Sequence, residues 1–245
     1  MESPASKRPK RGSASSRDAD ESLKSAIFFP DVSKIPYKPQ ATAAETMVFK
    51  HYNAEEIVYG KSMADWLRFS VCYWHTFRGQ GADPFGFPTI HRPWDDETNS
   101  LFNAKRRMYA AFEFMSKLGV HYWSFHDRDI SPEGANLKET NQNLDELVEL
   151  ASQLMEKHEI KLLWNTCNLF SHPRYMNGAF TNPDAHVFAY AAAQLLIILI
   201  SLEYKTKIGY EGQLLIEPKA KEPTRHQYDY GKVIFIFIVL YVCAV

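Results

Sequence analysis

In the segment "VHYWSFHDRDISPEG" (residues 120–134) an apolar, aromatic run ends in a dense group of ionisable side chains. Residues 120–125 have the composition of a strand that is buried in a sheet. Four ionisable residues then occupy positions 126–129. Such a group is compatible with ion pairing or with capping of the next helix, and equally with binding of a substrate or a metal. The surrounding sequence has to distinguish these alternatives.

Strand-like and helical segments alternate on both sides of this segment. The helical spacing of apolar residues predicts one helix that ends at Gly119 and another over residues 143–158. The alternation predicts βαβ units and a parallel sheet, and 245 residues is about the length of one eight-stranded β/α barrel. The predicted strands cover residues 67–77, 120–125, 160–168 and 212–219.

Polar and aromatic residues recur at the carboxyl ends of the predicted strands, which is the rim that carries the active site of a β/α barrel. One interpretation is that Asp129 orients the His126 imidazole for proton transfer at neutral pH, and the alternative is a local ion pair. The four groups are Trp74 with His75, His126 with Asp129, Trp164 with Asn165, and Glu217 with Lys219.

The other members of these groups have similar alternatives. Glu217 and Lys219 share one face of a strand, so they form a salt bridge or serve as a cation ligand and a group that binds a substrate oxygen. Trp74 and Trp164 are core residues or walls for the apolar faces of a sugar. Phe85 lies in a Gly- and Pro-rich turn, where an exposed aromatic residue suits insertion into a partner.

Composition and charge narrow the class of protein. The chain is 45% hydrophobic, and its net charge of −1 gives no electrostatic reason to expect a nucleic acid or membrane partner. Three widely spaced cysteines without a CxxC motif favour a reducing compartment, and we expect the protein in the cytoplasm.

The two ends of the chain differ from its middle. Residues 1–25 are polar and are predicted to be a disordered tail, whose basic run Lys7–Arg11 is a nuclear import signal or simply part of that tail. The apolar runs 195–202 and 233–245 are shorter than the ~20 residues of a membrane helix. The second run is interpreted as a buried strand or as sequence foreign to the rest of the fold.

Four long segments resemble xylose isomerases of the larger class, which is found in bacteria and plants. They are "HYNAEEIVYGKSMADWLRFSVCYWHTFRGQGADPFG", "AKRRMYAAFEFMSKLGVHYWSFHDRDISPEG", "NLFSHPRYMNGAFTNPDAHVFAYAAAQ" and "GQLLIEPKAKEPTRHQYDY". The resemblance implies a (β/α)8 TIM barrel, usually a homotetramer, that interconverts xylose with xylulose and glucose with fructose. It also implies two Mg²⁺, Mn²⁺ or Co²⁺ ions per subunit, ring opening of the sugar, and a hydride shift between its first two carbons.

The resemblance assigns a role to each of the candidate residues. His126 matches the histidine that assists ring opening, Asp129 the aspartate that orients it, and Lys219 the lysine near the reacting oxygens. Glu217 matches a ligand of the first metal ion. The substrate-binding aromatic residues are Trp74 and Trp164, which match pocket walls, and Phe85, which matches a residue that reaches into the site of a neighbouring subunit.

The resemblance also predicts an incomplete barrel. Residues 26–230 match family strands 1–3 and 5, strand 4 and strands 6–8 are missing, and residues 231–245 form an apolar tail that is foreign to the family. Two hypotheses follow for the chain. It is a xylose isomerase of impaired activity, or it is a non-catalytic isoform that only associates with full-length subunits.

Overall fold

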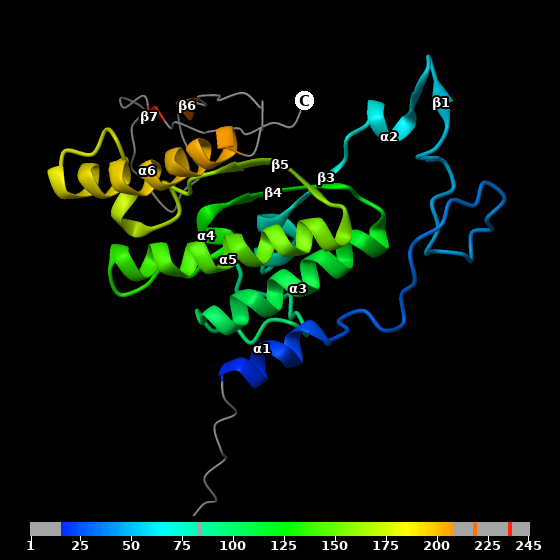
Figure 1. The fold of residues 1–245 in the computed structure, drawn as a ribbon, viewed down its shortest axis with the longest axis horizontal. Coiled ribbons are helices and arrows are strands. Elements are labelled where there is room, and N and C mark those ends of the chain that lie inside the picture. The colour runs from blue at the N-terminus through cyan, green and yellow to red at the C-terminus, as the bar shows by residue number, and fades with distance from the viewer. Residues whose placement is uncertain (1–15, 83–84, 208–217, 220–234, 237–245) are drawn as a thin grey trace, which may run out of the picture.

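The centre of the chain is a parallel sheet of three strands in the order β3-β4-β5 (Figure 1). The computed structural model describes residues 16–82, 85–207, 218–219 and 235–236. The strands are β3 (Ser70–Cys72), β4 (Tyr122–His126) and β5 (Lys161–Thr166), and both pairings between them are parallel. The predicted α/β class with a parallel sheet is confirmed, and three strands with helical connections are consistent with part of a barrel.

Two long helices lie side by side on one face of this sheet, as Figure 1 shows for α3 (Leu101–Leu118) and α5 (Leu137–His158). Gly119 ends α3 in the left-handed conformation with φ 76°, which confirms the end predicted from the sequence. Helix α5 begins six residues before its predicted start. Its cap, Asn136, accepts a hydrogen bond of 3.0 Å from the backbone N–H of Glu139.

The main core fills the space between the sheet and these two helices. Trp123 and Phe125 project from β4 into it, and the Phe112 ring lies 5.2 Å from the Trp123 ring. Since side chains alternate between the faces of a strand, Ser124 and His126 project from the opposite face. The helices therefore bury one face of β4 and leave the other for the candidate site. Further buried members of this core are Val71, Tyr73, Phe77, Met108, Met115, Ile130, Leu144, Leu154 and Ile160.

The N-terminal segment differs from the prediction of a disordered tail over residues 1–25. Residues 16–24 form helix α1 (Ser16–Lys24), which packs on the outer side of α3 (Figure 1). Leu23 is buried, and Lys105 of α3 pairs with Asp20 at 2.7 Å and with Glu146 of α5 at 2.6 Å. The polar composition did not predict this helix, because only a few contacts hold it in place: the burial of Leu23 and the ion pair of Asp20 with Lys105. Residues 1–15 lie outside the described part of the chain.

A small arm separates α1 from the sheet. It contains the antiparallel hairpin of β1 (Ile57–Val58) and β2 (Lys61–Ser62), followed by α2 (Met63–Trp66). Figure 1 shows this arm extending away from the helices that cover the sheet.

The predicted strand over residues 67–77 is wrong in its second half. Strand β3 ends at Cys72, and a π-helical turn, η1 (Trp74–Arg78), follows it. The turn brings the Tyr73 and Phe77 rings to 5.3 Å, and both side chains are buried in the main core. A strand would separate these rings by about 13 Å, so the packing of the core favours the turn.

The short helix α4 (Asp127–Ile130) lies between β4 and α5. After β5 the chain forms the short helix η2 (Pro173–Tyr175) and then α6 (Ala185–Lys207). A second, smaller core lies between the segment after β5 and the first half of α6. Its buried members are Cys167, Leu169, Tyr175, Ala179, Ala191 and Leu195. No helix within the described parts of the chain is long and apolar enough to cross a membrane.

The last predicted strand, residues 212–219, is only partly described. Its described residues form β6 (Pro218–Lys219), which pairs antiparallel with β7 (Phe235–Ile236) and not with the parallel sheet. The sequence predicts the apolar run 233–245 to be a buried strand or foreign sequence, and its described residues Phe235 and Ile236 form this second strand. Residues 212–217 lie outside the described part.

Candidate active site

Two local irregularities bring aromatic side chains to the face of the sheet opposite α3 and α5. The pairing of β4 with β5 shifts between Trp123 and Ser124, so that Leu163 is passed over and Trp164 lies opposite Ser124. Without this bulge Trp164 would share the face of Phe125, which is covered by helices. The π-helical turn after β3 supplies Trp74, whose ring centroid lies 5.1 Å from that of Trp164.

His126 ends β4 on this same face and is held by a single carboxylate. Asp129 Oδ2 lies 2.8 Å from the His126 backbone nitrogen and 2.7 Å from His126 Nδ1. Both side chains are about nine-tenths buried. Since a carboxylate accepts hydrogen bonds and does not donate them, Nδ1 carries a proton in this arrangement. The pair also caps α4, so the same geometry serves both the local pairing and the orientation of the His126 imidazole by Asp129.

Aromatic side chains from the η1 turn, from β5 and from the segment after β5 enclose His126. The centroid of its imidazole lies 4.8 Å from the Trp74 ring, 6.0 Å from the Trp164 ring and 5.4 Å from the Phe170 ring, and all three contacts are edge-to-face. Sequence reasoning found the two tryptophans and missed Phe170. The only signal for Phe170 was its position four residues beyond the end of β5.

The arrangement directs proton chemistry to the second nitrogen of His126. Nδ1 is occupied by Asp129, and no hydrogen bond joins Nε2 to any residue in the described part of the chain. A neutral imidazole with Nδ1 protonated can accept a proton at Nε2, and the adjacent carboxylate stabilises the imidazolium that forms. Apolar ring faces around such a group suit a ligand with C–H surfaces and hydroxyl groups.

Tyr73 lies behind this pair in the main core and is not an acid or base at neutral pH. Burial is the largest influence and raises the pKa of Tyr73 to about 12, although the positive charges of Arg107 and Arg78 oppose it. Its hydroxyl therefore remains neutral throughout the physiological range.

The other predicted site residues are not all brought together. His75 is exposed, and Asn165 lies opposite Phe125, on the face that the helices cover. Phe85 is 98% exposed, as the turn chemistry predicted, and its role in a partner stays a prediction. Glu217 lies outside the described residues, and Lys219 belongs to β6, so their predicted convergence with His126 stays untested.

The described residues do not by themselves fit a divalent metal ion. No three of their His, Cys, Asp and Glu side chains gather into a cluster that could hold one. The carboxylate of Asp129 already accepts two hydrogen bonds from His126, and Asp127 accepts bonds from backbone and side-chain N–H groups. A metal site in this protein would need Glu217 or other residues that are not described.

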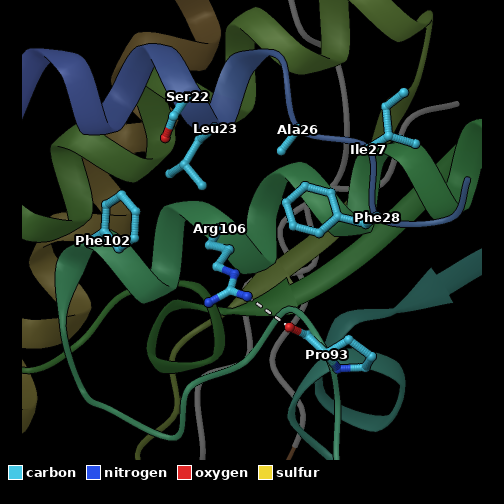
Figure 2. A pocket seen from close by; sticks show the side chains of 8 residues that line it. All are labelled: Ser22, Leu23, Ala26, Ile27, Phe28, Pro93, Phe102 and Arg106. Atoms are coloured by element: carbon cyan, nitrogen blue, oxygen red, sulfur yellow. Dashed lines mark hydrogen bonds between the residues drawn. The ribbon is translucent and has the colours of Figure 1, made fainter.

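A separate groove with a volume of about 440 Å³ lies between α1 and the start of α3. Figure 2 shows that its walls are mainly apolar and that Arg106 donates a hydrogen bond to the Pro93 carbonyl, at 2.8 Å. Arg106 is the only ionisable side chain among the lining residues, which are otherwise Ser22, Leu23, Ala26, Ile27, Phe28, Pro93 and Phe102. The groove therefore lacks an acid–base pair like that of His126 and Asp129.

The fold and this geometry define an α/β protein with a histidine–carboxylate pair inside aromatic walls, at the carboxyl end of a parallel strand. The comparisons with known proteins agree with this class. No family model matches the chain. Xylose isomerase of Hordeum vulgare is 50% identical over 243 residues, covering 83% of this chain and 50% of the barley protein.

Xylose isomerases of Arabidopsis thaliana and Caldicellulosiruptor bescii are 46% and 45% identical, each over 83% of this chain. The alignments cover 51% and 55% of those two proteins, so the chain spans about half the length of the curated relatives it matches. The chain belongs to the xylose isomerase family.

Proposed function

We propose that the chain carries the sugar-binding and ring-opening part of a xylose isomerase, and that the whole reaction is the conversion of D-xylose to D-xylulose. The observation that supports this most is the buried His126–Asp129 pair enclosed by Trp74, Trp164 and Phe170. The identity of 43–50% to xylose isomerases supports the choice of substrate. D-glucose, converted to D-fructose, is proposed as a second substrate.

The proposed chemistry of this chain is proton transfer during ring opening. The cyclic sugar lies with C–H faces against the aromatic walls, and an aldose ring opens when the proton of its anomeric hydroxyl is removed and the ring oxygen is protonated. His126 Nε2 accepts the hydroxyl proton, while Asp129 keeps the proton on Nδ1 and stabilises the imidazolium. The protonated Nε2 can then return a proton to the ring oxygen, and atoms and charges balance.

The divalent metal is a further proposal, which rests on the family. We propose Mg²⁺, or Mn²⁺ or Co²⁺ in its place, with Glu217 as a ligand and Lys219 near the sugar oxygens. When bound, such ions polarise the oxygens of the open sugar as Lewis acids. Because the described residues do not form the metal site, the ring-opening step above uses only His126, Asp129 and the aromatic walls.

A second proposal concerns partners, for which the open edges of the sheet give a specific reason. Within the described residues β3 and β5 each pair with one neighbour only, so each presents a free edge. Free edges invite pairing with other strands. We therefore propose that the chain associates with further isomerase subunits, as a catalytic member of a tetramer or as a non-catalytic isoform. The spacing of the cysteines supports a reducing, cytoplasmic location.

The isomerase assay tests the proposed function. Purified chain with Mg²⁺ or Mn²⁺ is incubated with D-xylose, alone and after mixing with a full-length xylose isomerase, and D-xylulose is measured. The catalytic proposal expects metal-dependent xylulose formation that His126→Asn abolishes. A matched control is His91→Asn, because His91 also pairs with a carboxylate, Glu97 at 3.5 Å, but is 88% exposed. No xylulose from the chain alone, together with co-elution of the chain and the full-length subunits in size-exclusion chromatography, supports the non-catalytic isoform.

A further inference from the structure

A buried polar network lies directly behind the candidate site and joins the end of β4 to α6. Asp127 follows His126 in the sequence and its side chain is 3% exposed. Its Oδ1 accepts hydrogen bonds from the backbone N–H groups of Arg128, at 2.8 Å, and Asn168, at 2.7 Å. Its Oδ2 accepts from Gln194 Nε2, at 2.8 Å, so Asp127 connects three separate segments.

Gln194 closes this network from α6. Its Nε2 donates both to Asp127 Oδ2 and to the Asn168 carbonyl, at 3.1 Å, while its Oε1 accepts from the Tyr175 hydroxyl, at 2.7 Å. The Gln194 Nε2 thus faces two acceptors and its Oε1 faces one donor, so only one of the two possible orientations of the amide satisfies all three bonds. Asn168 is thus held at both its backbone N–H and its carbonyl.

The segment that this network holds carries an aromatic wall of the site. The Asn168 side chain accepts hydrogen bonds from the backbone N–H groups of Phe170, at 3.3 Å, and Ser171, at 2.9 Å. The Phe170 ring lies 5.4 Å from the His126 ring. A continuous series of contacts therefore runs from Gln194 through Asn168 to Phe170 and His126.

We propose that Asp127 and Gln194 are positioning residues that hold Phe170 against His126 and so fix the wall of the sugar site. The proposal deepens the proposed function and rests on it only where sugar binding is concerned. Neither side chain needs to touch the sugar. Asp127 cannot be replaced by a neutral acceptor without loss, since its carboxylate serves three N–H donors in a buried place.

The first test needs no sugar and measures the surroundings of His126 by NMR of histidine-labelled protein. Removal of the network should move the His126 ring signals toward their positions in Phe170→Leu, because the ring current of Phe170 is displaced. The variants are Gln194→Met and the milder Tyr175→Phe, which removes only the bond that orients the Gln194 amide. The matched control is Tyr190→Phe, which removes a hydroxyl that bonds Glu133, at 3.0 Å, from the same helix.

The second test measures the dissociation constant of xylose from quenching of tryptophan fluorescence. Loss of one aromatic contact is expected to weaken binding about 2- to 10-fold in Gln194→Met, and not in Tyr190→Phe. If Gln194→Met and Tyr175→Phe melt at lower temperature but keep the wild-type His126 signals, the network is only structural and the proposal is wrong. A wild-type chain that binds no xylose contradicts the proposed function, while the NMR result still decides the positioning role.

Discussion

Replacement of Asp129 gives the most quantitative test of the candidate site, because its carboxylate serves two buried donors. In Asp129→Asn the amide oxygen can still accept from the His126 backbone N–H and from Nδ1, but it no longer carries a charge. A hydrogen bond to a charged group contributes about 1.5–3 kcal/mol and a neutral one about 0.5–1.5 kcal/mol. Two such bonds give a loss of about 2–3 kcal/mol in the free energy of unfolding.

Asp129→Ala removes the acceptor altogether and leaves two buried N–H donors without a partner. Each unsatisfied donor costs about 1–3 kcal/mol, so the expected loss is about 2–6 kcal/mol. Urea denaturation measures both changes, and the exposed Asp145→Asn on α5 is the control, with an expected effect within about 0.5 kcal/mol. Equal midpoints for Asp129→Ala and the wild type would refute the geometry of the pair.

Three further predictions concern the scaffold around the site. Burial favours the protonated form of Glu133, but its bonds with Arg174 and Tyr190 hold the pKa of Glu133 below its ordinary value of 4.5. The stability that ionised Glu133 contributes is present above pH 4.5 and is lost as the pH falls through its folded-state pKa. The difference in melting temperature between wild type and Glu133→Gln should therefore shrink as the pH falls through that range. An equal difference at pH 7 and in acid would contradict this prediction. Gly119→Ala should lower the free energy of unfolding by about 1 kcal/mol in urea denaturation, because residue 119 has a left-handed φ of 76°. Steric clash adds little to this cost, since an added Cβ would meet no atom closer than Lys34 Cε, at 3.6 Å. An unchanged midpoint would contradict the left-handed cap. Leu23→Ala should lower the free energy of unfolding by about 2–5 kcal/mol, because Leu23 is buried where α1 packs on α3. A loss below about 0.5 kcal/mol would instead support the prediction of a disordered tail.

The sequence predicted the regular part of the fold well. Apolar residues at helical spacing located α3 and most of α5, and Gly119 located the end of α3, since these signals are local. The strand before His126 was also predictable, because a buried apolar run and a polar end coincide there. From these elements the position of His126 and Asp129 at a strand end followed directly.

The remainder depended on contacts between distant segments. The turn after Cys72 forms because the Tyr73 and Phe77 rings pack together in the core, and an apolar run does not reveal that choice between strand and turn. The bulge that places Trp164 on the face of His126 arises from the register between β4 and β5. The role of Phe170 depends on hydrogen bonds with Asp127 and α6, which no local pattern contains.

If the buried His126–Asp129 pair opens the ring of an aldose, it also accelerates the exchange between the α and β anomers of D-xylose, because the two anomers interconvert through the open chain. NMR exchange spectroscopy follows this anomer exchange without requiring the later isomerisation. We predict that the chain accelerates the exchange over buffer, that His126→Asn abolishes the acceleration, and that the exposed control His91→Asn retains it. Exchange at the buffer rate with xylose bound, or equal acceleration by wild type and His126→Asn, would show that this pair does not open the sugar ring.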